Sequence, residues 1–445
     1  MVNLASLRRW LERWVVLRPG EMPALLWSFA YFFCLLAGYY VLRPLRDEMG
    51  VVGGVRNLQW LFTATFVVML GAVPLFGAVV ARLPRRRFIP LVYHFFVVNL
   101  AIFWLLLTLD IGKVQVARVF FVWISVFNLF AVSVFWSFMA DLFASEQGKR
   151  LFGFIAAGGS AGALLGPALT VGLALPLGPV NLLMVAALFL ELAVLCARRL
   201  EVAAMDLSSA SGGAGAEADM PAAAPEAAAL GGNWLEGIVL LLRSPYLGGI
   251  ALWVALLSLA GTFLYFQQAS IVAAASDDPA VRTRIFAAID LAIGILTLGV
   301  QCLATGRLIS RCGVGAAAAL LPCVFGLGFL ALAWSPALVV VIIFQAIQRT
   351  ANFAISNPAR EVLFTVVERA EKYKAKNVID IVIFRGADAF NGWLFALLRG
   401  AGLELSAISL WTLPLTVAWA GLSLALGRAQ ERRAAPLRTR PEVSS

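Results

Sequence analysis

The sequence predicts an all-α membrane protein with about twelve transmembrane helices in two six-helix halves. Of its 445 residues, 61% are hydrophobic and 13% are charged, whereas a soluble domain is about half apolar and a quarter charged. The apolar residues fall in blocks of about 20, the length that a helix needs to cross the hydrocarbon layer. The short stretches of alternating polarity that are typical of membrane β-barrels do not occur, so the spans are predicted to be helices.

The elements follow from the chain in order. Residues 1–22 are basic and contain tryptophans, which predicts an interfacial helix and not a cleavable signal peptide. A first bundle, 23–197, then holds the candidate spans 23–43, 58–81, 88–109, 118–143, 151–173 and 179–197. The segment 198–233 is rich in Ala, Gly and Ser and predicts a flexible cytoplasmic linker. A second bundle, 234–430, opens with a short interfacial helix and holds the spans 246–270, 285–305, 315–333, 336–356, 378–400 and 404–427. A tail, 431–445, completes the chain.

The basic residues predict the orientation. With both termini in the cytoplasm, about 25 of the 35 Lys and Arg residues fall on the cytoplasmic side and about 8 on the other. The net charge of +10 therefore records membrane topology and gives no reason to expect nucleic acid as a partner. We expect a multi-pass protein of the cell's inner membrane that contacts the lipid bilayer and is a monomer.

Soluble catalytic signatures are missing from the sequence. There is no Walker-type phosphate-binding motif and no convergent Ser/His/Asp or metal-ligand set, so we expect neither an enzyme nor a cofactor. The glycines that begin at Gly158 lie within the fifth span, where small residues let helices approach closely. They predict helix packing and not a phosphate cradle.

Charged and aromatic residues in the first bundle form one group of candidates. Arg43, Arg46 and Asp47 follow the first span, and Pro44 should kink or end the helix there. These charges belong either to a binding site or to an ordinary interfacial loop. Trp136 lies on an aromatic and polar face of the fourth span, which suits a planar ligand or simple packing equally well.

The second bundle carries charges at mid-span, where each costs about 2.5–3.5 kcal/mol on insertion scales and is a functional candidate by default. In the tenth span Arg349 and Asn352 share one helical face with Gln345 and Ser356. In the eleventh span Arg385 and Asp388 are three residues apart and can pair, and Asp380 lies nearby. The alternative in both spans is an internal ion pair that only fixes helix packing.

Arginines from the interior of two half-bundles would suit an anionic substrate, because guanidinium groups stay charged and bind phosphate oxygens in pairs. The preferred hypothesis is a transporter for a phosphorylated or nucleotide-like solute, although inward acids lower the positive potential. A second hypothesis is proton-coupled export, with Asp290, Asp380, Asp388 or His94 as proton carriers. A third is a membrane scaffold or sensor that no longer transports.

Two halves across a central loop resemble the major facilitator superfamily. The turn after the eighth span, Gly306-RLISRCG, is similar to the superfamily's G-x-x-x-D-R-x-G-R motif and keeps Gly306, Arg311 and Gly313, with Ser310 in place of the aspartate. The turn after the second span, Gly77-AVVARLPRRR, keeps less of it. The resemblance implies a transporter fold.

Three stretches also resemble the nucleotide (ATP/ADP) antiporter family, a branch of that superfamily. They are Leu42-RPLRD, Val134-FWSFMADLFASEQGKRLFG and Asn357-PAREVLFTVVERAEKYKAKNVIDIV. The resemblance implies roles in nucleotide binding and exchange for Arg43, Arg46, Asp47, Arg360, Glu361, Lys376 and Asp380. The chain departs from the family's pattern at Pro44, at Arg46 and Arg360, which replace lysines, and at Ala140–Asp141, which replaces Asn–Glu.

Overall fold

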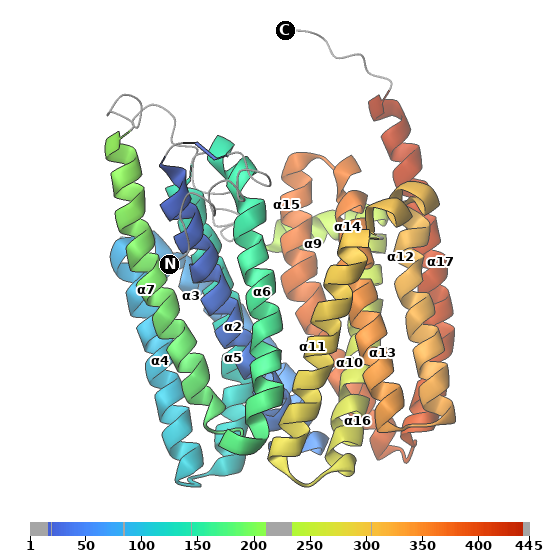
Figure 1. The fold of residues 1–445 in the computed structure, drawn as a ribbon. Coiled ribbons are helices and arrows are strands. Elements are labelled where there is room, and N and C mark those ends of the chain that lie inside the picture. Colours follow the sequence, from blue (N-terminus) through green and yellow to red (C-terminus); the bar gives the residue numbers. More distant parts are fainter. Residues whose placement is uncertain are drawn as a thin grey trace. The chain divides into compact units, whose positions relative to one another are not determined.

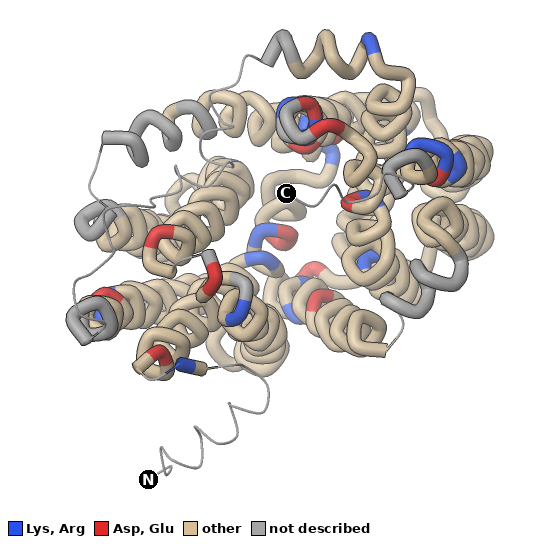
Figure 2. Tube along the Cα trace, turned by 90° about the horizontal axis from the view of Figure 1, so that it is seen from above, with Lys and Arg blue, Asp and Glu red and all other residues tan. Residues whose placement is uncertain are grey.

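The computed structural model describes residues 17–18, 20–82, 85–143, 145–210, 234–303 and 305–438. These residues are almost entirely helical and contain no strand, as predicted. Ten of their helices are long and apolar enough to cross a membrane, and α3 and α7 add two further long helices. Seen along the helices, most of the trace is neither acidic nor basic (Figure 2). Most of the predicted interfacial helix lies outside the described residues, whereas the predicted tail begins as the last part of α17, which continues to Arg438.

The chain divides into two compact units (Figure 1). Unit 1 contains residues 1–49, 71–231 and 279–288. Its long helices run side by side (Figure 1). They are α2 (Glu21–Val52), the second part of α3 (Leu58–Arg82), α4 (Arg85–Thr108), α5 (Lys113–Leu142), α6 (Ser145–Leu177) and α7 (Leu182–Ala210). Helix α7 continues to Ala210, so it extends into the range of the predicted linker.

The glycines of α6 let it lie directly against α2. A Cβ atom on Gly162 would collide with the carbonyl oxygen of Phe33, and one on Gly166 would stand 2.7 Å from that of Ala37. Any side chain at these positions would therefore meet backbone. The prediction that the glycine stretch serves helix packing is confirmed.

Helix α2 does not end at Pro44. It continues to Val52, so Arg43, Arg46 and Asp47 stand on its last turns and not in a loop. The missing N–H of a proline costs a helix one hydrogen bond, and membrane helices tolerate this when neighbours hold the segment. Here Leu42 is fully buried beside the proline, which keeps the helix in place. The interfacial-loop alternative for these charges is therefore wrong.

Unit 2 contains residues 50–70, 232–278 and 289–445. Its helices are η1 (Val55–Asn57), the first part of α3, α9 (Trp234–Arg243), α10 (Pro245–Ala275), most of α11 (Pro279–Leu303), α12 (Thr305–Trp334), α13 (Leu338–Ala351), α14 (Asn357–Leu363), η4 (Phe364–Val366), α15 (Arg369–Asn377), α16 (Phe384–Gly400) and α17 (Leu405–Arg438). Two π-helical segments, η3 (Asn352–Ser356) and η5 (Val378–Ile383), join α13 to α14 and α15 to α16. Helix α9 stands where a short helix was predicted, and it packs on α15.

The units differ from the predicted bundles at two short segments. The first ten residues of α11 count with unit 1, where the Arg282 guanidinium donates two hydrogen bonds to Glu48 of α2, at 2.8 and 2.6 Å. The first part of α3 counts with unit 2, where the indole of Trp393 donates to the Thr63 hydroxyl at 3.1 Å. Local packing, and not position in the sequence, decides where these segments belong.

The turn that resembles the facilitator motif lies at the start of α12. The backbone leaves helical geometry at Gly313, with φ 78° and ψ 166°. This is a left-handed conformation that only glycine adopts at low cost. The predicted span begins two residues later, as the break requires.

Candidate functional site: ion pairs and amides in unit 2

The tenth predicted span ends in a π-helical segment, and the eleventh begins with one. A π-helical turn inserts an extra residue and redirects the side chains that follow it, and such turns occur frequently at functional sites. Segment η3 carries Asn352 and Ser356, and η5 carries Asp380. The polar residues of both spans therefore surround two local breaks in regular α-helix.

Four residues of the antiporter-like stretch meet in space. The Arg360 guanidinium of α14 lies 3.1 Å from Asp380 of η5, and the Lys376 ammonium of α15 lies 2.9 Å from Glu361 of α14. All four groups are only partly exposed. Residues 15 and 20 positions apart in the sequence thus form two adjacent ion pairs between three short helical segments.

Arg349 of α13 has its own carboxylate partner. Its Nη1 donates to Asp290 Oδ1 of α11 at 2.8 Å. The Asp290 side chain is 2% exposed, whereas that of Arg349 is 23% exposed. A carboxylate this deeply buried needs a charged partner, because desolvation of a lone charge is costly. The salt bridge proposed as an alternative for this span is present, and the arginine side chain stays partly exposed.

Arg385 and Asp388 of α16 form the predicted pair, with 3.7 Å between Nη1 and Oδ2. The second Asp388 oxygen accepts hydrogen bonds from Ser258 at 2.6 Å and from Thr262 at 3.3 Å, both on α10. Asn391 in turn donates to Ser258 at 3.3 Å. This network ties α16 to α10 through polar groups inside the unit.

A group of buried amides lies on α10 and α13. The side chain of Gln345 donates to Gln268, and Gln348 donates to Gln345 at 2.8 Å. These three side chains are at most 7% exposed. Further along the same chain segment, Asn352 Oδ1 and Ser356 Oγ are buried with no hydrogen-bond partner among the described residues.

The sequence indicated only part of this amide group. Gln345, Asn352 and Ser356 were visible as a stripe with a helical spacing, whereas Gln268 and Gln348 were missed. A glutamine within an apolar block was the available signal, because a polar group in lipid needs a partner. The spacing along α13 could not reveal a partner on α10.

The candidate residues of unit 1 are held by aromatic and charged neighbours. The Arg46 guanidinium lies 4.2 Å from the Phe121 ring centre, and its Nη1 is 3.8 Å from Asp47. Arg43 lies over the Tyr40 ring at 5.6 Å. Trp136 makes edge contacts with Phe32, Phe135 and Phe152 and therefore takes part in aromatic packing.

Other acids in unit 1 also have basic neighbours, among them Glu48 and Glu191. Sequence reasoning missed the Glu48–Arg282 pair, in which the carboxylate is fully buried. His94, one of the proton-carrier candidates, has Nε2 at 3.5 Å from Glu191 and Nδ1 at 2.6 Å from the Pro90 carbonyl. The described part of the chain holds no group of three or more potential metal ligands.

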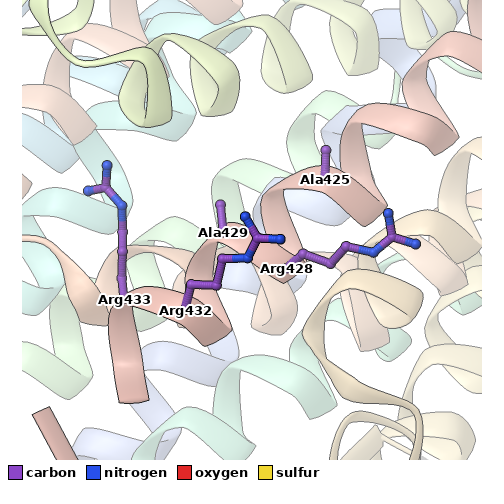
Figure 3. A pocket seen from close by; sticks show the side chains of 5 residues that line it. All are labelled: Ala425, Arg428, Ala429, Arg432 and Arg433. Carbon is purple, nitrogen blue, oxygen red and sulfur yellow. The ribbon is translucent and has the colours of Figure 1, made fainter. Parts of the chain in front are cut away.

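A cluster of arginines lines a cavity near the C-terminal end of α17. The cavity measures about 360 Å³ and is lined by Ala425, Arg428, Ala429, Arg432 and Arg433. Arg428 and Arg432 extend to the same side of the helix, whereas Arg433 points away from them (Figure 3) and lies 4.4 Å from the Tyr246 ring. All of these lining residues belong to α17, so no second element closes the cavity among the residues that line it.

Solved structures with this arrangement of helices are known. No family model and no curated protein matches the chain. The crystal structure of a mutant of the nucleoside transporter NupG has a TM-score of 0.60 at 14% identity, covering 93% of this chain and 99% of that one. The fold is major-facilitator-like. At this low identity the likeness establishes the fold alone.

Two further structures share this major-facilitator-like fold. A bacterial homologue of the human lysosomal transporter Spinster, inward-facing and unoccupied, has a TM-score of 0.54 at 15% identity, with 96% and 100% of the two chains covered. A POT family transporter in complex with 5-aminolevulinic acid has a TM-score of 0.60 at 11% identity, with 91% and 96% covered. The predicted fold class is thereby confirmed, whereas the resemblance to the ATP/ADP antiporter branch stays a prediction.

Proposed function

We propose that the protein is a secondary transporter that carries a phosphorylated, nucleotide-like solute by alternating access, as an antiporter. The observation that carries this proposal is a set of four cations in α13–α16, each paired with a carboxylate; the Arg349–Asp290 and Arg385–Asp388 pairs lie within predicted membrane spans. A fold that needs only mechanical stability has no reason to bear the insertion cost of the four charges in these two pairs. In this proposal the charges take part in binding and moving the solute.

Because each of the four cations is already paired with a carboxylate, an incoming anion would have to replace that carboxylate. A phosphate group would exchange with a carboxylate for the guanidinium, because both anions can accept two hydrogen bonds from it at once. The empty carrier would then keep its cations neutralised until the solute arrives. Arg349 and Arg385 suit this exchange best, since they keep 23% and 33% of their side chains exposed beside their acids.

Antiport of nucleotides rests on the antiporter-like stretches. Arg360, Glu361, Lys376 and Asp380 were singled out by that resemblance, and they meet in one cluster between α14, α15 and η5. In this proposal the two pairs bind the phosphate end of the solute or couple its binding to helix movement. Arg43, Arg46 and Asp47 are the corresponding candidates of α2.

A second candidate is transport of an uncharged, nucleoside-like solute. The buried amides of Gln268, Gln345 and Asn352 favour it, because amides recognise the hydrogen-bonding edges of a base without any charge. The neutralised state of the cations favours it too. NupG, a nucleoside transporter with the same fold, is consistent with this reading.

Counterflow in proteoliposomes tests the proposal. Vesicles loaded with ADP, ATP, adenosine or buffer alone would receive external radiolabelled ADP or adenosine. We expect internal ADP or ATP to accelerate ADP uptake at least about tenfold over buffer, and an uncoupler to leave this exchange unchanged. Exchange of adenosine without exchange of ADP would support the uncharged solute instead.

Two further outcomes separate the remaining alternatives. Uptake that collapses when the pH gradient is dissipated would favour proton-coupled transport, with Asp290, Asp380, Asp388 or His94 as carriers. Absence of any solute-dependent flux, together with no thermal stabilisation by nucleotides or phosphate, would favour a scaffold or sensor. A bound ligand at 100 times its dissociation constant stabilises a protein by about 2.7 kcal/mol, so a flat thermal shift is informative.

A further inference from the structure

We propose that unit 2 holds a second, peripheral anion site, which captures the phosphate-bearing solute before it reaches the ion pairs. The site is a cavity of about 590 Å³ between the end of α10, the end of α16 and the η1–α3 corner. This inference rests on the proposed function and adds a recruitment step to it. The residues that carry it are Arg56, Gln59, Phe266, Ser270, Phe395 and Arg399.

The cavity differs in charge from the inner cluster. Arg56 and Arg399 line it, and none of its lining residues is acidic. Neither arginine has a carboxylate within ion-pair distance among the described residues, whereas Arg349, Arg360, Lys376 and Arg385 each have one. An incoming anion would therefore meet two available guanidinium groups here without first displacing an acid.

The two arginines are also in an unexpected place. Both lie on the side of the membrane to which the charge bias assigns only about 8 of the 35 basic residues. Two of these few converge on one cavity. The main-chain carbonyl of Leu403 accepts a hydrogen bond from Arg399 at 3.0 Å, which orients that side chain and leaves its other N–H groups for a ligand.

The other residues that line the cavity suit the base of a nucleotide. Phe266 and Phe395 are 2% and 5% exposed and their rings lie 5.2 Å apart, so they form a rigid apolar wall of the cavity. The Ser270 hydroxyl donates to the Phe266 carbonyl at 2.8 Å and is left to accept a hydrogen bond. Gln59 supplies both a donor and an acceptor. The cavity volume lies within the range of about 300–1,000 Å³ that is usual for small-molecule sites.

The cavity and the inner cluster are joined by the same helices. Along α16, Arg399 follows Asp388 by eleven residues, or about 16 Å at 1.5 Å per residue. Along α10, Ser270 follows Thr262, which donates to Asp388. Arg399 and the Arg385–Asp388 pair therefore stand on the same helix, and α10 contacts both the cavity and the pair.

The test measures transport kinetics separately for each side of the membrane. In proteoliposomes of known orientation, the Arg56→Gln/Arg399→Gln variant should raise the KM for ADP added at the cavity side about tenfold or more, because each lost charged hydrogen bond weakens binding. The KM for ADP supplied from the other side, and the rate at saturating ADP, should stay at the wild-type values. Arg284→Gln removes an exposed arginine outside the cavity and is the matched control, with no expected change in either KM.

The outcomes separate this inference from the proposed function. Wild-type exchange of ADP combined with an unchanged KM in the double variant would overturn the peripheral site and leave the transporter proposal intact. Absence of ADP exchange in the wild type would overturn the proposed function itself. An equal rise of KM on both sides would show a general structural effect and would also overturn the recruitment role.

Discussion

At the scale of single residues, the organising feature is that buried charges in unit 2 occur in pairs. Asp290 is 2% exposed and depends on Arg349 for a counter-charge. The same holds for Asp388, which has Arg385 and two hydroxyl donors. Breaking such a pair is more harmful than removing both members, because a lone buried charge keeps its desolvation penalty and loses its attraction.

This difference leads to a double-mutant prediction. Arg349→Gln should lower the free energy of unfolding by about 3 kcal/mol, since it leaves the buried Asp290 carboxylate without its guanidinium. Adding Asp290→Asn should recover most of that loss, because two neutral amides can hydrogen-bond to each other. Melting temperatures of the purified variants in detergent measure both effects. A double variant that is as unstable as Arg349→Gln alone would contradict the pairing.

The sequence predicted some of these residues better than others. The Arg385–Asp388 pair follows from helical spacing, because both residues stand on one turn. The Arg349–Asp290 and Arg360–Asp380 pairs join different segments, and the spacing within one helix carries no information on such contacts. The antiporter-like stretch singled out Arg360 and Asp380 together, although it did not indicate that they touch.

At the scale of helices, apolar length predicted the spans well, and prolines and π-helical turns limited the prediction of their ends. The predicted first span stopped at residue 43, but α2 continues through Pro44 to Val52 because its neighbours hold the helix. The predicted spans 336–356 and 378–400 each contain a π-helical segment. Such a segment has no apolar period of its own, so hydropathy could not reveal it.

The packing of α6 on α2 predicts that glycine-to-alanine substitutions at two positions of α6 change the stability of the protein in different directions. Gly162→Ala should destabilise the protein by about 1–3 kcal/mol, because its Cβ would collide with the Phe33 carbonyl oxygen. Gly172→Ala on the same helix should be neutral or stabilising by up to about 1 kcal/mol, because no atom lies within 4 Å and alanine favours helix. Thermal unfolding monitored by gel filtration measures the pair. Equal effects at both positions would show that α6 does not pack on α2 in this way.

At the scale of the whole molecule, the chain order and the compact units do not coincide. The Glu48–Arg282 pair joins residues 234 positions apart within unit 1, and Trp393 contacts Thr63 across 330 positions within unit 2. The predicted bundles 23–197 and 234–430 are divided at the linker, because its composition differs clearly from that of the spans. Composition does not show that residues 50–70 pack with the second half of the chain and residues 279–288 with the first half. Only the structure shows this.

The direction of insertion is the remaining prediction for the whole molecule. About 25 of the 35 basic residues fall on one side if both termini are cytoplasmic, and this bias sets orientation during insertion. Green fluorescent protein fused after residue 438 should therefore fluoresce, whereas alkaline phosphatase fused there should be inactive. Alkaline phosphatase inserted after Ile111 or Ala401, in the short turns at the opposite ends of the helices, should be active. The reverse pattern would place the Arg428, Arg432 and Arg433 cluster outside the cell and the cavity with Arg56 and Arg399 inside, and the solute captured there would then be one that leaves the cytoplasm.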